Sequence, residues 1–123
     1  MEKMDFTSKV LGPAAAHRLK KRKVTQTLRS ESSSIASAIL NGQVSAGDQL
    51  EVILDGIIAG HAEFIYMDAV TWDSLDVDDA LRGGFDSLED LQAALRRAGF
   101  RIKPLKEYHL FRIQFSWLDE VYV

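Results

Sequence analysis

The basic run near the N-terminus holds the side chains best suited to chemistry. Five of the six residues from Arg18 to Lys23 are cationic, and Thr25, Thr27 and Arg29 follow at every second position. Phosphate recognition needs cationic donors and hydroxyls that converge from a rigid element. In an extended strand, alternate residues share one face, and this series forms a column about 20 Å long. The pattern predicts a contact surface for phosphate groups.

We expect this surface to bind RNA or a modified nucleotide. Its predicted contact residues are Lys20, Lys21, Arg22, Lys23, Thr25, Thr27, Arg29, Ser30 and Glu31. Glu31 is either an acceptor for base edges or the first acid of the next helix. Two simpler interpretations of the basic run stay open. It is a solvated helix end whose lysines complement the helix dipole, or it is a patch that docks a protein.

The charge of the chain is unevenly distributed. Residues 1–30 hold eight Lys and Arg against two Asp and Glu, whereas the formal net charge of the whole chain is −3. This balance argues against nonspecific coating of DNA but permits a local contact with RNA. The chain has no cysteine, which excludes disulfides and thiolate sites. No apolar run reaches the roughly 18 residues of a membrane span, so we expect a cytoplasmic protein without a membrane partner.

Helices and strands alternate irregularly along the chain. We expect strands at residues 3–9, 24–29, 50–54, 57–70 and 108–117, and helices at 13–21, 34–40, 75–82 and from Asp86 or Ser87 to 98. Asp55-Gly56 predicts a tight hairpin because both residues accept positive φ. Gly60 predicts a bulge in the long strand that follows. In the second helix after that strand, Ser87 and either Glu89 or Asp90 predict a capping box.

This order lacks the regular alternation of a parallel α/β sheet. It favours an α+β fold: a small, mixed, mostly antiparallel β-barrel with flanking helices. We expect one domain over residues 1–123, with its core at about 16–117 and a C-terminal tail at 118–123. Within residues 24–29, Val24, Gln26 and Leu28 alternate with the more polar side chains, which predicts one buried and one wet face.

Four segments together resemble one known family. They are the stretch from Lys23 to Ser32, the turn Ala46-Gly47-Asp48 before Leu50-x-Val52-x-Leu54, the helix start Gly84-Phe85-x-Ser87-x-x-Asp90-Leu91, and the strand Phe111-x-Ile113-x-Phe115. Their order and spacing are similar to those of ASCH domains, which belong to the PUA-like superfamily. The resemblance implies a PUA-like β-barrel with a cleft beside the threonine strand and RNA as its partner.

The resemblance also implies an enzymatic alternative. Some small ASCH proteins remove the acetyl group from N4-acetylcytidine with a Lys, a Thr and a Glu. By position the threonine falls on Thr27, the lysine on Val24 with Lys23 one residue earlier, and the glutamate near Gly83. Lys23 would then be the activating base and Thr27 the nucleophile or orienting group, with Asp78 or Asp79 replacing the glutamate. The motif is only partly matched, so the resemblance favours binding over catalysis. A single-strand ribonuclease is a further alternative.

Metal and cofactor chemistry find little support in the pattern. His61 and Glu63 share a strand face, but no third ligand follows at a suitable spacing. We expect no metal site and no cofactor. For Trp117 the strand pattern favours packing in the core, whereas Trp72 suits either packing or stacking on a base.

Overall fold

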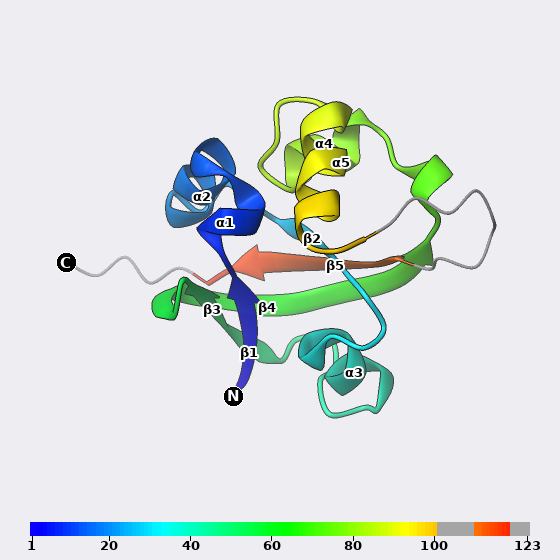
Figure 1. Cartoon of the computed structure of the whole chain (residues 1–123). Coiled ribbons are helices and arrows are strands. Elements are labelled where there is room, and N and C mark those ends of the chain that lie inside the picture. The colour runs from blue at the N-terminus through cyan, green and yellow to red at the C-terminus, as the bar shows by residue number, and fades with distance from the viewer. Residues whose placement is uncertain (101–109, 119–123) are drawn as a thin grey trace.

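Five strands form one mixed sheet in the computed structural model, which describes residues 1–100 and 110–118 (Figure 1). The elements are β1 (Glu2–Phe6), α1 (Ser8–Leu11), α2 (Pro13–Lys20), β2 (Gln26–Arg29), α3 (Ser34–Leu40), β3 (Gln49–Leu54), β4 (Ile57–Val70), a 3-10 turn (Trp72–Ser74), α4 (Val77–Arg82), α5 (Leu88–Arg97) and β5 (Leu110–Trp117). Residues 108, 109 and 119–123, which the predicted last strand and tail include, lie outside the described residues.

The strand order across the sheet is β1-β3-β4-β5-β2. The β1–β3 pair is parallel, and the other three pairs are antiparallel. The sheet curls into a half-barrel with helices around it, which confirms the predicted α+β class and the mostly antiparallel pairing. Because β1 and β2 are the two edges of the sheet, the curl leaves an open seam between them.

The hairpin between β3 and β4 confirms the turn prediction. Asp55 and Gly56 have φ values of 51° and 81°, the positive values that this kind of two-residue turn requires. The predicted bulge is present as well, since Val52 pairs with Gly60 while the next residue, Ile53, pairs with Ile58. Glycine is needed at this bulge because a Cβ on Gly60 would lie 2.9 Å from the ring of Trp117.

Side-chain caps fix where the helices begin. Ser33 caps α3 and Ser87 caps α5, each accepting a hydrogen bond from a backbone N–H three residues on. At α4 the side chains of Asp76 and Asp79 each accept from the backbone N–H of the other, which forms a capping box. At α5, where a capping box was predicted, the Ser87 cap is present without the reciprocal bond. The predicted start of α4 at residue 75 was two residues early. The first strand also ends before residue 9, because Thr7 caps α1.

Two adjoining apolar clusters form the core. One lies between the sheet and the helices α2 and α3, around fully buried residues such as Met4, Leu19 and Ile113. The other joins α4 and α5 to the ends of β2 and β5, around Leu91 and Leu110. In Figure 1, α1, α2, α4 and α5 are drawn above the curled sheet, and α3 is drawn below it next to β1. Among the described helices, none is long and apolar enough to cross a membrane.

Candidate ligand-binding site

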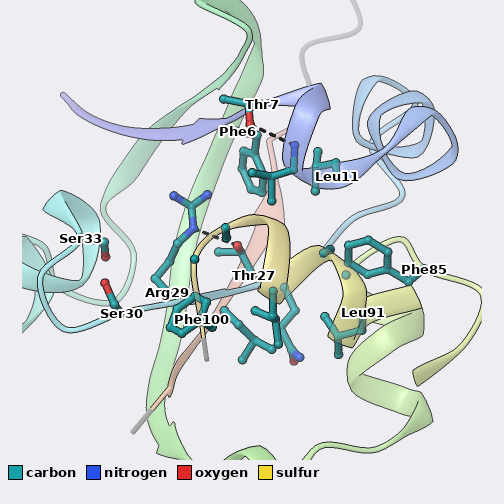
Figure 2. A pocket seen from close by; sticks show the side chains of 18 of the residues that line it. Phe6, Thr7, Leu11, Thr27, Arg29, Ser30, Ser33, Phe85, Leu91 and Phe100 are labelled. Carbon is teal, nitrogen blue, oxygen red and sulfur yellow. Dashed lines mark hydrogen bonds between the residues drawn. The ribbon is translucent and has the colours of Figure 1, made fainter. Parts of the chain in front are cut away.

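A pocket of about 500 Å³ opens at the seam between the two edge strands. One wall comes from the end of β1 and from α1, and the facing wall comes from β2 and the loop that leads to α3. Helix α5 and the residues after it close a third side (Figure 2). The pocket therefore lies between the two edges of the sheet, which do not pair with each other.

Arg29 is the cation in the lining of this pocket. Its Nε donates to the Thr27 hydroxyl oxygen at 3.0 Å, and its guanidinium carbon lies 4.7 Å from the centre of the Phe6 ring. Figure 2 shows the guanidinium extending past Thr27 toward Phe6. Among the described residues, no carboxylate forms an ion pair with Arg29 and its two terminal nitrogens have no hydrogen-bond acceptor.

Burial lowers the pKa of Arg29 to about 10, and the negative charge of Asp5 opposes this shift only in part. The side chain is therefore still protonated at neutral pH. A cation that is half-buried without an ion-pair partner keeps unused donors in a poorly hydrated setting. Such a group is suited to bind an anion that enters the pocket.

A polar network forms part of the pocket wall at Gln26 and Asp79. Asp79 is 2% exposed, and its Oδ1 accepts hydrogen bonds from the Gln26 amide at 2.9 Å and from Arg112 at 3.0 Å. Arg112 also binds Asp68 through two nitrogens. The side-chain NH₂ of Gln114 donates to the side-chain oxygen Oε1 of Gln26 at 3.2 Å. Since this oxygen must face Gln114, the Gln26 NH₂ group must face Asp79.

The carboxyl group of Asp79 is held in its ionised form. Burial alone would raise its pKa, but the hydrogen bonds from Gln26, from the Asp76 backbone and from Arg112 together hold the pKa below its ordinary value. In the described part of the chain, every fully buried side-chain nitrogen and oxygen has a hydrogen-bond partner. Each buried polar atom of the network thus has at least one partner without a ligand, and Gln26 and Asp79 also line the pocket.

The remaining walls are mainly apolar. Phe85, Leu91 and Phe100 point toward the pocket in Figure 2, and Leu28 and Leu95 add to the same surface. On the side of α3, the Ser30 and Ser33 hydroxyls face each other. A flat ring fits such walls, and its polar edge and any attached anion would find partners in separate parts of the lining.

The structure brings together only part of the predicted contact surface. Thr27, Arg29 and Ser30 line the pocket, whereas Thr25 lines a shallow hollow elsewhere, with Ile65 and Arg82 among its neighbours. The strand itself begins at Gln26 rather than at residue 24. The predicted column of polar side chains from Lys23 to Arg29 was therefore too long. Alternation of side chains does not show at which residue the backbone pairing with β5 begins or ends.

The basic run lies outside the pocket lining. Lys20, Lys21, Lys23 and Glu31 are exposed, and none of them lines the pocket. Arg22 adopts a positive φ of 61° at the turn after α2, and its guanidinium carbon lies 5.9 Å from the centre of the Trp117 ring. A role for these residues in RNA binding stays a prediction.

Of the residues that correspond to the catalytic groups of the amidohydrolases, some line the pocket and others lie outside it. Thr27 lines the pocket and Lys23 does not. Gly83, which stands where the resembling enzymes have their glutamate, also lines the pocket but has no carboxylate. Asp79, one of the two acids predicted as a replacement, does line the pocket, while Asp78 is exposed. Among the pocket residues none is a lysine.

Sequence reasoning missed several lining residues. Asp5 and Phe6 come from a strand far from β2 in the sequence, and Phe100 follows α5. Gln26 did leave a signal, because it is a polar residue on the buried face of an alternating strand and is 1% exposed. A buried amide needs polar partners, so this position is the signal from which a buried polar network could have been predicted.

The histidine and tryptophan side chains considered as candidates each contact other protein side chains or backbone groups. His61 lies 3.7 Å from Glu51, and no cluster of three or more metal-ligating side chains occurs among residues 1–100 and 110–118. Trp117 donates from its indole nitrogen to the Val24 carbonyl at 2.7 Å and packs at its edge against Phe115, as predicted for a core residue. Trp72 is half-buried, with the Arg96 guanidinium 5.7 Å from its ring centre.

The curled, mixed half-barrel with outer helices is a PUA-like fold. Comparison with solved structures identifies the particular fold as that of an ASCH domain. A crystal structure of an ASCH domain from Lactobacillus crispatus JV V101 matches 84% of this chain and 69% of its own, with a TM-score of 0.60 and 16% sequence identity. At this identity the likeness establishes the fold. No protein-family model matches the sequence, and no match was found among curated proteins.

Proposed function

We propose that this protein binds RNA or a nucleotide, and that the pocket at the seam between β1 and β2 is the binding site. The observation that supports this most is Arg29, a half-buried cation with unused donors in a mainly apolar pocket. A nucleotide combines a flat ring, a polar ring edge and a phosphate, and the lining offers a partner for each of them. The ASCH fold agrees with this function but does not specify a ligand.

The basic run has a separate place in the proposal. Lys20, Lys21 and Lys23 are exposed and positively charged, so they attract an RNA strand without reading its sequence. The pocket would then hold one unit of that strand, while the lysines contact phosphates beyond it. This division predicts two measurable components of binding, one sensitive to salt and one sensitive to the pocket.

Fluorescence anisotropy with short single-stranded RNA tests the proposal. We expect binding at low salt that weakens as salt rises, with a slope set by the number of phosphate contacts. Replacing Lys20, Lys21 and Lys23 together with Gln should reduce that slope. A control variant with Lys3, Lys9 and Arg82 replaced by Gln removes the same charge from exposed positions elsewhere. Absence of binding to both RNA and free nucleotides at low salt would contradict the proposal.

A second candidate is hydrolysis of N4-acetylcytidine. The observation that favours it is the presence of Thr27 and the Asp79 carboxylate in one pocket lining. This pocket lacks the lysine of the resembling enzymes, because Lys23 is exposed outside the lining. The Asp79 carboxylate is already held as an anion by three donors, which are the Gln26 amide, the Asp76 backbone N–H and Arg112. Release of acetate by the wild type, and its loss in Thr27→Val, would establish this activity.

A further inference from the structure

The charges in the pocket lining suggest which form of phosphate it accepts. The lining contains three ionisable side chains: Arg29, Asp5 and Asp79. Asp79 accepts from Arg112 and from the Gln26 amide, but Arg112 also binds Asp68, so this network keeps one net negative charge at the Gln26 end of the pocket. Arg29 and Asp5 come from opposite edge strands and form no ion pair, although Asp5 acts on Arg29 electrostatically. The cation is thus available to a ligand while an exposed anion lies nearby.

Hydroxyl groups add donors beside Arg29. The Ser33 hydroxyl oxygen accepts from the Ala36 amide at 3.3 Å, which leaves its own hydrogen free to donate. The Ser30 hydroxyl lies 3.0 Å from that of Ser32 and faces Ser33 in Figure 2. A phosphate group bound to Arg29 would find these hydroxyls on the same side of the pocket. The lining here offers donors for one anionic group.

At Gln26 and Asp79 the lining suits a group that donates hydrogen bonds rather than an anion. The carboxylate repels phosphate oxygens and accepts from amino or imino groups. Gln26 donates one amide hydrogen to Asp79 and accepts from Gln114, so its second hydrogen and its second lone pair are unused. A ring edge with donors and acceptors fits this part of the lining, while Phe85 and Leu91 offer apolar surface to the ring face.

We propose that the pocket holds one nucleotide unit whose base edge faces Gln26 and Asp79 and whose singly charged phosphodiester binds Arg29, and that Asp5 disfavours a doubly charged terminal phosphate. This inference rests on the proposed function. It means that the site prefers a nucleotide inside an RNA strand, where each phosphate has one charge, to a free 5′-monophosphate, whose second ionisation lies near pH 6.

Three probes with the same base separate these contributions. They are a nucleoside, its 5′-monophosphate and the methyl ester of that monophosphate, measured by calorimetry at about pH 8 for each of the common bases. For the base that binds, we expect the ester to bind about 10- to 100-fold more tightly than the nucleoside, since charge-assisted hydrogen bonds contribute this much. We expect the monophosphate to bind about two- to tenfold more weakly than the ester.

Two variants assign the effects to residues. Arg29→Gln should make nucleoside and ester bind equally, and Asp5→Asn should remove the preference for the ester over the monophosphate. Lys3→Gln and Glu2→Gln are the matched controls, because they change the same charges at positions outside the lining. Asp5 is exposed, so its variant tests the proposal even if Arg29→Gln fails to fold.

The outcomes distinguish this inference from the function on which it rests. If RNA or nucleotides bind but the monophosphate binds as well as the ester, or Arg29→Gln leaves the phosphate effect intact, the inference is wrong and the proposed function stands. If neither RNA nor any of the three probes binds, the proposed function fails and the inference fails with it. An unchanged preference in Asp5→Asn would also overturn the role of Asp5.

Discussion

Asp79 offers the most direct test of how the buried network supports the pocket. The change Asp79→Asn keeps the shape of the side chain and one oxygen atom, which can still accept from Gln26 and Arg112. It removes the negative charge from the Arg112 contact at 3.0 Å and places an NH₂ group where the carboxylate accepts from the Asp76 amide at 3.1 Å. We therefore expect loss of one charge-assisted contact and of half the capping box.

The two losses give the size of the effect. A hydrogen bond between charged groups contributes about 1.5–3 kcal/mol, and a disturbed cap costs about 1 kcal/mol. We expect Asp79→Asn to lower the free energy of unfolding by about 2–4 kcal/mol in total. Asp78→Asn is the matched control, because Asp78 has the same charge in the same helix but is exposed. Its effect should stay within about 0.5 kcal/mol.

Urea unfolding at equilibrium measures both variants, with stability taken from linear extrapolation. The pH dependence adds a second test. Because the folded state lowers the pKa of Asp79, its contribution is present above the unfolded value of about 3.9 and is lost as pH falls through the folded value. The difference between wild type and Asp79→Asn should shrink in acid. Equal stabilities of Asp79→Asn and Asp78→Asn at neutral pH would refute this reasoning.

Two further predictions concern stability away from the pocket network. Gly84→Ala should destabilise the fold by about 2 kcal/mol or more, because Gly84 has a φ of 92° and an added Cβ would lie 2.8 Å from Val24. Gly99→Ala, at a φ of 101° with open space around it, gives the backbone cost alone, and thermal unfolding should place it between wild type and Gly84→Ala. Asp55 accepts from the backbone and hydroxyl of Ser8, and these bonds lower its pKa, so Asp55→Asn should reduce stability at neutral pH and differ less from wild type as pH falls below about 4. Identical acid-induced losses in wild type and Asp55→Asn, measured by circular dichroism, would contradict that role.

The features that local sequence predicted are those that depend on neighbouring residues. Asp55-Gly56 specifies its turn through the φ values of the two residues themselves, and Ser87 caps α5 through a bond three residues away. The alternation at Val24, Gln26 and Leu28 predicted correctly which side chains of β2, and of the residue two positions before it, are buried. Such patterns are encoded within one turn or one strand.

The candidate site depends on pairs that are distant in the sequence. Gln26 reaches Asp79 across 53 positions, and Gln114 reaches Gln26 across 88. No spacing rule predicts these contacts, because they follow from where β5 inserts between β4 and β2. The basic run was the strongest signal in the sequence, yet its exposed lysines lie outside the pocket lining. Charge density showed where cations gather and not which cavity they face.

The edge position of β1 has a consequence for the lifetime of the cavity. This strand is paired through its backbone with β3 on one side only, and it supplies Asp5 and Phe6 to the wall opposite β2. Edge elements detach at a lower free energy than central ones. When β1 detaches, the pocket loses this wall while the central strands stay paired. The rate of amide hydrogen exchange at residues 2–6 would therefore report how often the pocket opens on this side.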